Sequence, residues 1–454
     1  MDPFVSALEQ AAAVRRREVS AGELVDMYLE RIARLGPALN AFWLTTPELA
    51  RSQARQLPDG PLAGACTSIK DLAAMAGFPL TFGSRAFDAQ VAQSDSFAVS
   101  RIKAAGCPIL GRTTTPELGS RPVTEFGLHG VTRNPWSLSH TSGGSSGGAA
   151  AALAAGLCAW SHGTDGGGSV RIPASCCGVV GLKPSRGRVS LGPLVGEGWA
   201  GLSTQGVLTR TAEDAGAALD AIAGHLPGDP YWADSDGSFL EAARREPRPL
   251  RIGVQVSADT PVHPELVDLV GKTAGRLEAL GHRVEEGGPD TRPFRKAQET
   301  IVAAGTASYD IADPSVLDPL NAWLVEESLK LTAADYVRAV NTVRTQSRLV
   351  VAFWDEHDVL ITPTLTRPPV EVGRFAGDPA RAMREGFDWL AFTYPYNCTG
   401  QPAISLPLGV SSEGLPLGVQ LVGPPRGEGL ILSLAGQLEK DRPWSGGKPA
   451  ERVA

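Results

Sequence analysis

Short apolar runs alternate with segments of helical periodicity along most of the chain. The apolar runs predict strands, and the segments that repeat apolar residues every three or four positions predict helices. Alternation of this kind favours an α/β fold, in which helices cover both faces of a sheet. The predicted strands are 66–69, 107–110, 157–161, 178–183, 205–209, 249–254, 282–284, 358–363, 403–406 and 417–422, and the predicted helices are 95–105, 149–155, 212–223, 263–280 and 427–439.

Two other parts of the chain are predicted to be mainly helical. Residues 4–35 fit two helices, and Ser20 with Glu23 forms a capping-box pattern at the start of the second. Pro47 suits the first position of a third helix. Residues 292–353 also have a mostly helical pattern. We interpret residues 1–454 as one domain, with N-terminal helices at 1–60, a core section at 61–225 and a helical excursion at about 292–395.

Two loops rich in glycine and serine stand in the middle of the core section. The first is GGSSGG at 143–148, and the second is DGGGS at 165–169. Glycine at this density lets a ligand approach the main chain. The predicted order of loop, helix, strand and loop brings Ser145 and Ser169 close together. A serine nucleophile needs a base, and the oxyanion that it creates needs donors, which the glycine amides of the second loop can supply.

Three other interpretations of these loops explain less. Gly143-x-Ser145-x-Gly147 matches the nucleophile elbow of α/β-hydrolases, with His357 late in the chain, but an elbow follows a strand and residues 134–142 are predicted to form a turn and loop. GGSSGG also resembles the phosphate loop of mevalonate-type and homoserine-type kinases, which leaves the second loop unexplained. Tight turns alone do not account for serines in both loops.

Lys70 is the candidate base. It ends a predicted strand, where burial beside hydroxyl groups disfavours the charged ammonium and lowers its pKa. Asp71 is expected to point to the opposite face of that strand, because side chains alternate along a strand. His162 lies too close in sequence to Asp165 and Ser169 for the three side chains to form a relay, so we interpret it as structural.

Six segments of the chain match a known family. The chain resembles the amidase signature family of Ser-Ser-Lys hydrolases. The resemblance covers PLAGACTSIKD, AAGCPILGRTTTPE, NPWSLSHTSGGSSGG and GTDGGGSVRIPASCCGVVGLKPSRGRVS within residues 61–209, with NCTGQPAISLPLG and GLPLGVQLVGP at 397–424. It implies an α/β fold with a central mixed, twisted β-sheet covered by α-helices on both faces.

The resemblance also implies a role for individual residues. Ser169 matches the acyl-enzyme nucleophile, Ser145 matches a bridging serine that follows a cis peptide bond, and Lys70 matches the terminal base. The matched oxyanion hole consists of the amides of Gly166, Gly167 and Gly168, together with that of Ser169, and the matched supporting residues are Ser146 and Asp165.

Composition and charge exclude several other classes of protein. The formal net charge is −7 and the longest basic run is Arg15 to Arg17, so nucleic acid is not an expected partner. The N-terminus does not resemble a signal peptide, and the apolar stretch at 149–160 is too short to span a bilayer, so we expect a cytoplasmic protein without a membrane anchor. The six cysteines and seven histidines lack metal-ligand spacing, so neither a metal nor a cofactor is expected.

The expected substrate is a small amide or carbamate. Aromatic residues are frequent at 292–400, which favours aryl amides, anilides or aryl carbamates, as a urethanase would cleave, if some of them line the pocket. The glutaminase subunit of a transfer-RNA-dependent amidotransferase and a non-catalytic amide-binding protein are the alternatives. A monomer or homodimer is expected. The aromatic residues concerned are Trp323, Phe387, Trp389, Phe392, Tyr394 and Tyr396.

Overall fold

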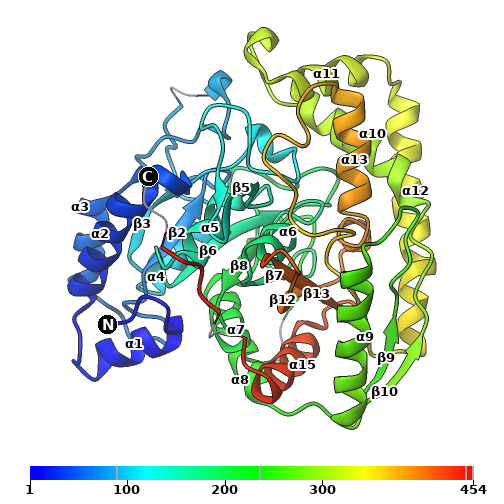
Figure 1. Ribbon diagram of the computed structural model, residues 1–454. Helices are drawn as coiled ribbons and strands as arrows, with labels where there is room; N and C mark the ends of the chain where they lie inside the picture. Colours follow the sequence, from blue (N-terminus) through cyan, green and yellow to red (C-terminus); the bar gives the residue numbers. More distant parts are fainter. Residues whose placement is uncertain (88–89, 235–236, 445–446, 452–454) are drawn as a thin grey trace.

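A mixed β-sheet of eleven strands runs through the middle of the molecule (Figure 1). The computed structural model describes residues 1–454 except 88–89, 235–236, 445–446 and 452–454. The strand order is β1-β3-β2-β6-β8-β7-β12-β13-β11-β9-β10. Parallel pairing joins β3, β2 and β6 at one end and β11, β9 and β10 at the other, and the intervening pairs are antiparallel. The predicted mixed sheet is therefore confirmed.

The strands are short, and several of them are buried along their whole length. Those of the central sheet are β1 (Phe42–Thr45), β2 (Thr67–Lys70), β3 (Ile109–Thr113), β6 (Trp160–Asp165), β7 (Val180–Lys183), β8 (Thr204–Thr209), β9 (Arg251–Val254), β10 (Arg283–Glu286), β11 (Val359–Pro363), β12 (Ala403–Val410) and β13 (Pro416–Val422). A separate hairpin pairs β4 (Arg133–Asn134) with β5 (Ser137–Thr141).

Helices cover both faces of the sheet, as the alternating pattern predicts (Figure 1). The second helix begins at the predicted capping box of Ser20 and Glu23. The longer helices outside the helical excursion are α1 (Ala7–Arg15), α2 (Ala21–Leu39), α3 (Pro47–Ala54), α4 (Phe97–Ala104), α5 (Gly147–Ala154), α6 (Arg171–Cys177), α7 (Ala212–Ile222), α8 (Phe239–Arg244), α9 (Pro264–Ala279) and α15 (Glu428–Asp441).

The helical excursion packs beside the sheet as a layer of its own. In this layer α10 contacts both α11 and α12, and α11 contacts α13. The layer stands at the right and top of Figure 1. Its members are α10 (Phe294–Ala307), α11 (Pro319–Leu329), α12 (Ala333–Val351), α13 (Pro379–Trp389) and α14 (Pro395–Cys398).

Two elements differ from the predictions. The strand predicted at 157–161 lies instead at Trp160–Asp165, because the polar side chains of β6 are buried against hydrogen-bonding partners and the apolar run before it is not part of the strand. Residues 134–142, predicted as a turn and loop, contain β5. The main chain of Thr141 at the end of β5 bonds that of Val370, so a distant segment stabilises a strand that the apolar pattern does not reveal.

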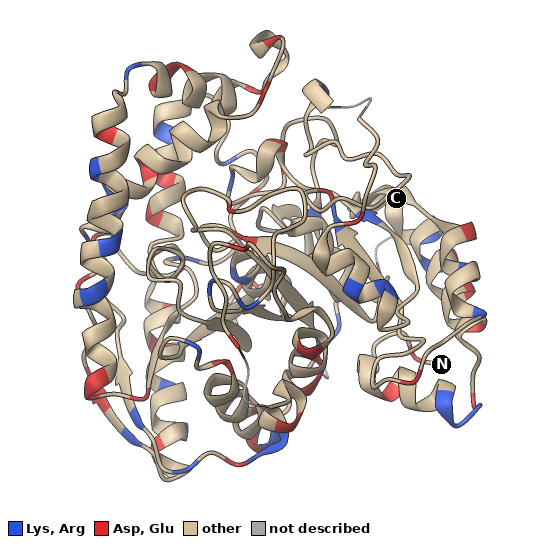
Figure 2. Ribbon diagram, turned by 180° about the vertical axis from the view of Figure 1, so that it is seen from behind, with Lys and Arg blue, Asp and Glu red and all other residues tan. Residues whose placement is uncertain are grey.

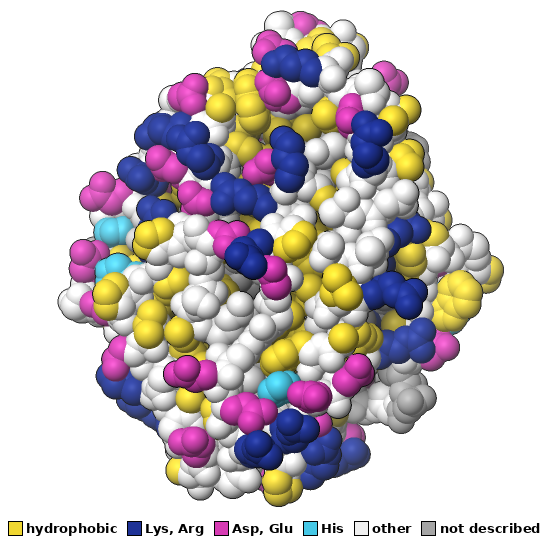
Figure 3. All heavy atoms as spheres, turned by 90° about the vertical axis from the view of Figure 1, so that its right-hand side faces the viewer, with side chains coloured by type: hydrophobic (Ala, Val, Ile, Leu, Met, Phe, Trp, Pro, Cys, Tyr) yellow, Lys and Arg dark blue, Asp and Glu magenta, His cyan; other side chains and the backbone are white. Residues whose placement is uncertain are grey.

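Basic and acidic residues are interspersed along the outer helices (Figure 2). On the face shown in Figure 3, Lys and Arg alternate with Asp and Glu, and small apolar areas lie between them. None of the helices that the structure describes is long and apolar enough to cross a bilayer. Within the described ranges, no cluster of three His, Cys, Asp or Glu side chains could hold a metal ion.

Candidate active site

Lys70 is the last residue of β2 and is fully buried. Its Nζ donates hydrogen bonds to Ser145 Oγ at 2.7 Å and to Thr164 Oγ1 at 2.9 Å. Burial lowers the pKa of Lys70 well below its ordinary value, and the negative charge of Asp165 opposes that shift only in part. Asp71 turns away from the site and pairs with buried Arg112, as alternation along the strand predicts. Among the residues that the structure describes, Lys70 therefore has hydroxyl groups, and no carboxylate, as its hydrogen-bond partners.

Ser145 lies in the first glycine-serine loop, next to a tightly packed turn. The Gly144–Ser145 peptide bond is cis. A Cβ on Gly144 would come within 2.8 Å of the Val123 main chain, so this position accommodates only glycine. Ser145 does not contact His357, which pairs instead with Glu285 at 2.9 Å. The nucleophile-elbow arrangement is therefore absent from the part of the chain that the structure describes.

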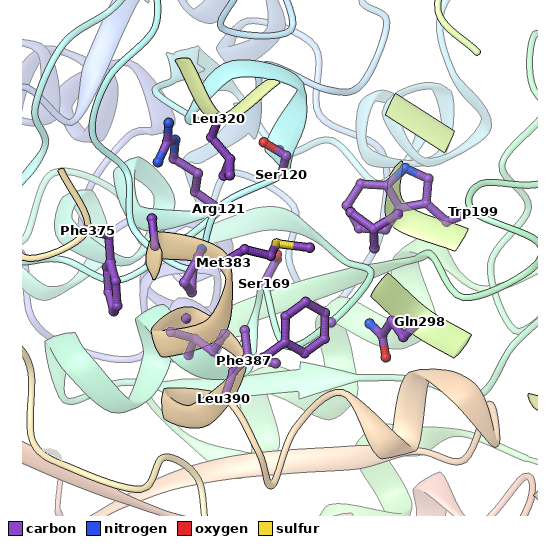
Figure 4. Close-up of a pocket in the computed structure, with 17 residues that line it drawn as sticks. Ser120, Arg121, Ser169, Trp199, Gln298, Leu320, Phe375, Met383, Phe387 and Leu390 are labelled. Atoms are coloured by element: carbon purple, nitrogen blue, oxygen red, sulfur yellow. The ribbon is translucent and has the colours of Figure 1, made fainter. Parts of the chain in front are cut away.

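A main-chain hydrogen bond joins the two glycine-serine loops. The Ser146 amide donates to the Ser169 carbonyl oxygen at 3.0 Å, and Ser146 Oγ donates to the Thr164 carbonyl oxygen at 3.2 Å. Ser145 and Ser169 thus stand on adjoining loops, as the sequence predicts. Among the described residues Ser169 Oγ has no hydrogen-bond partner, and it faces a cavity (Figure 4).

Asp165 holds the second loop in shape. Its carboxylate accepts from the amides of Gly168 and Val170 and from the guanidinium of Arg171, and Asn397 donates to it at 2.9 Å. Burial acts to raise the pKa of Asp165, but Arg171, together with Lys183 and Asn397, outweighs burial and holds that pKa below its ordinary value. Arg171 also donates to Asn397 Oδ1. The loop is therefore fixed by an ionised carboxylate.

The loop amides differ in whether they are free to bind a ligand. Gly168 N–H is bonded to Asp165 at 2.8 Å, so it is not a free donor. No described residue accepts from the amides of Gly167 or Ser169. Gln298 donates to the Gly166 carbonyl oxygen at 3.3 Å, and because a trans peptide is planar, that bond also fixes the direction of the Gly167 N–H. Gln298 in turn accepts from the thiol of Cys398 at 3.3 Å.

The cavity beside Ser169 has mostly apolar walls and a volume of about 50 Å³. Its charged residue, Arg121, pairs with Asp318 at 2.6 Å and lies over the Phe126 ring. An uncharged ligand group suits such walls. The lining residues are Gly119, Ser120, Arg121, Pro122, Gly167, Ser169, Ile172, Trp199, Gln298, Val302, Leu320, Phe375, Ala382, Met383, Gly386, Phe387 and Leu390 (Figure 4).

The aromatic residues singled out from the sequence occupy different places. Phe387 lines the cavity beside Ser169, whereas Trp389 belongs to the core. Trp323 packs against the apolar cluster of α10 and α11. Three others, Phe392, Tyr394 and Tyr396, line a separate cavity. Cavity-lining residues that the sequence analysis missed include Trp199, Phe375 and Met383. The helical spacing of 382, 383, 386, 387 and 390 is a signal that could have revealed one wall.

His162 does not take part in this arrangement. Its Nε2 bonds Gln205 Oε1 at 2.7 Å. Burial lowers the pKa of His162 to about 4, so the ring is neutral at pH 7. This agrees with the structural role expected from the sequence.

Comparison with known proteins gives a consistent result. A family model described as Amidase matches residues 23–432. The 6-aminohexanoate-cyclic-dimer hydrolase of Paenarthrobacter ureafaciens is 36% identical over 99% of this chain and 97% of its own. An acylamidase of Rhodococcus erythropolis is 35% identical over 99% of this chain and 98% of its own. A solved structure of a 6-aminohexanoate cyclic dimer hydrolase with substrate superimposes with a TM-score of 0.95, at 35% identity and 99% coverage of each chain.

Proposed function

The chain belongs to the amidase family of hydrolases that act on non-peptide carbon–nitrogen bonds, and on that premise we propose that it cleaves small amides through a Ser169–Ser145–Lys70 relay and a covalent acyl-enzyme. The observation that carries this proposal is the 2.7 Å contact between Lys70 Nζ and Ser145 Oγ. A buried lysine whose pKa is depressed is neutral more easily, and only a neutral lysine can accept a proton.

The relay accounts for every proton. As Ser169 Oγ bonds to the substrate carbonyl carbon, its proton passes to Ser145 Oγ, and the Ser145 proton passes to Lys70 Nζ. The carbonyl oxygen becomes an oxyanion, which the free amides of Gly167 and Ser169 stabilise, with the Gly166 amide at the same loop. When the C–N bond breaks, the proton returns through Ser145 to the leaving amine. Water then enters, and the same relay hydrolyses the ester.

Ser146 and Asp165 support the relay without touching the substrate. Ser146 ties one loop to the other, and Asp165 fixes the second loop by binding Gly168, Val170 and Arg171. The catalytic atoms are therefore held before the substrate arrives, which lowers the cost of reaching the transition state.

The proposed substrates are neutral amides with an apolar group, with aryl amides, anilides and aryl carbamates as the preferred classes. The walls around Ser169 are mostly apolar and aromatic, and the Arg121 charge there is already paired. A glutaminase pocket would need groups that bind the ammonium and carboxylate of glutamine, and these walls favour a free hydrolase instead. A non-catalytic binding protein would not require the lysine-to-serine contact.

The test combines labelling with hydrolysis. A fluorophosphonate should add once, at Ser169 by peptide mapping, and the unlabelled protein should hydrolyse a nitroanilide or an aryl carbamate. Ser169→Ala should abolish both results, whereas Ser100→Ala, at an exposed serine of α4, should change neither. An adduct at Ser145 or Ser146 would contradict the assigned nucleophile, and no adduct or turnover would favour a binding role.

A further inference from the structure

A second cavity adjoins the one beside Ser169. Its volume is about 300 Å³, and Phe387 on α13 borders both cavities. On the side of the second cavity the Phe387 ring meets the Tyr394 ring edge-on, with centroids 5.4 Å apart, and the Arg295 guanidinium lies 5.9 Å from its centre. The Phe387 side chain is therefore a partition between a small reaction cavity and a larger one.

The size of the reaction cavity makes this partition important. Its volume of about 50 Å³ is only about twice the volume that one water molecule takes up in liquid water. Sites for small organic ligands are usually larger, at roughly 300 Å³ or more. The second cavity alone reaches that range, whereas the reaction cavity reaches it only if the two are joined past Phe387, which borders both. An acyl group of more than a few atoms therefore needs the second cavity.

The relay determines which half of the substrate lies next to Phe387. Ser145 returns the proton to the leaving amine, so the amine lies on the Ser145 side. Gly119 borders that side, because a Cβ there would lie 3.3 Å from Ser145 Oγ. Ser120, the next residue, and Phe387 stand on opposite sides of Ser169 in Figure 4. The acyl half therefore extends toward Phe387.

The second cavity has a more polar lining than the first. Its cations are already paired, because Arg292 bonds Asp290 at 2.8 Å and Arg295 bonds Asp388 at 2.5 Å. Tyr394 is 5% exposed, and its hydroxyl has no hydrogen-bond partner among the described residues. A neutral hydrogen-bonding group suits such a lining, since an anionic group would have to displace a carboxylate from Arg292 or Arg295.

We propose that the second cavity binds the far end of a long acyl chain that carries a neutral polar group, and that Phe387 controls access to it. This inference rests on the proposed amidase function and names its substrate class: amides of long, ω-hydroxylated or similarly polar carboxylic acids.

Nitroanilides of acetic, hexanoic and decanoic acid test the partition. Phe387→Ala should raise kcat/KM for the decanoyl substrate by about tenfold relative to the acetyl substrate, since shape changes in a pocket act on this scale. Phe375→Ala, which enlarges only the reaction cavity, is the matched control and should show no such dependence on chain length. Acetamides with lengthened amine groups should gain nothing from Phe387→Ala. Equal gains in both variants, or a gain confined to the amine series, would overturn the proposal.

The polar end has its own test. The ω-hydroxydecanoyl nitroanilide should be cleaved about fivefold better than the decanoyl one, and Tyr394→Phe should remove that preference. No preference in the unmodified protein would refute binding of the polar end. Hydrolysis of the acetyl nitroanilide and labelling of Ser169 are the reference, because their loss in the unmodified protein would refute the amidase function itself.

Discussion

The two sides of the cavity at Ser169 are built in different ways. On one side, the glycine-serine loops are held by main-chain hydrogen bonds and by the carboxylate of Asp165, which leaves little room for side-chain variation. On the other side, α11 and α13 present apolar side chains such as Leu320 and Met383, which contact one another only through packing. Packed surfaces tolerate substitution better than a buried network of polar groups. This contrast suggests that the loops determine the reaction and the helical wall determines the substrate.

Removal of the base should have the largest effect. Lys70→Ala should lower kcat/KM by roughly a thousandfold or more for every amide, since residues that act as one catalytic unit are lost together. Lys183→Met is the matched control, because Lys183 is another buried lysine at the end of a strand. Steady-state kinetics with a short and a long anilide will compare the two. A loss by Lys70→Ala that depends on the substrate would contradict the contrast between loops and wall.

A second comparison uses two buried ion pairs, one on each side. Asp165→Asn leaves the Arg171 guanidinium without its carboxylate and should lower the free energy of unfolding by about 3–5 kcal/mol. Asp318→Asn removes the carboxylate that pairs with the Arg121 guanidinium on the helical side. The Phe126 ring still covers that guanidinium, so the loss of unfolding free energy should be smaller. Urea denaturation measures both. Equal losses would show that the two ion pairs contribute equally to stability and would contradict the contrast between the two sides.

The pH dependence of activity should follow the protonation of Lys70 beside the glycine-serine loops, and residues of the helical wall should not affect it. Burial depresses the Lys70 pKa, and the reaction needs neutral Lys70. Activity is therefore lost as pH falls below that depressed pKa, and kcat/KM should rise by about tenfold per pH unit up to it and then level off. The level region should begin well below the ordinary lysine pKa of 10.5. Met383→Ala should leave the shape of the profile unchanged, and activity that falls with rising pH would exclude Lys70 as the base.

Gln298 lies on α10, which packs against α11, and it also touches the second loop, so its effect should be intermediate. Gln298→Glu replaces the donor to the Gly166 carbonyl oxygen by a second acceptor, and kcat should fall by roughly tenfold with little change in KM. Affinity for a trifluoromethyl ketone, which forms an oxyanion, should fall in parallel. Cys398→Ser keeps a donor to Gln298 and serves as the control. A change confined to KM would assign Gln298 to substrate binding alone.

The sequence contains most of the information about the loops and little about the wall. Lys70, Ser145 and Ser169 stand in glycine-rich or strand-end motifs, so local pattern and family resemblance single them out together as the proposed catalytic residues. The hydrogen bond from the Gly168 amide to Asp165 was not predictable, because it depends on the direction in which one amide points in the folded chain. Asn397 is 226 residues from Arg171 in the chain, and local patterns carry no information on such a contact. Apolarity also misplaced β6, whose polar side chains include Ser161 and His162, buried against the distant partners Ser68 and Gln205.

Finally, the six cysteines of the chain are all buried, and burial raises the pKa of each thiol. Thiol-directed reagents react with the thiolate, so the folded native chain should hardly react with maleimides. A single engineered cysteine would then carry a fluorophore without any native cysteine having to be removed first. Leu329, which is 81% exposed at the end of α11, offers such an attachment point. The helical wall could be followed by fluorescence while a substrate enters.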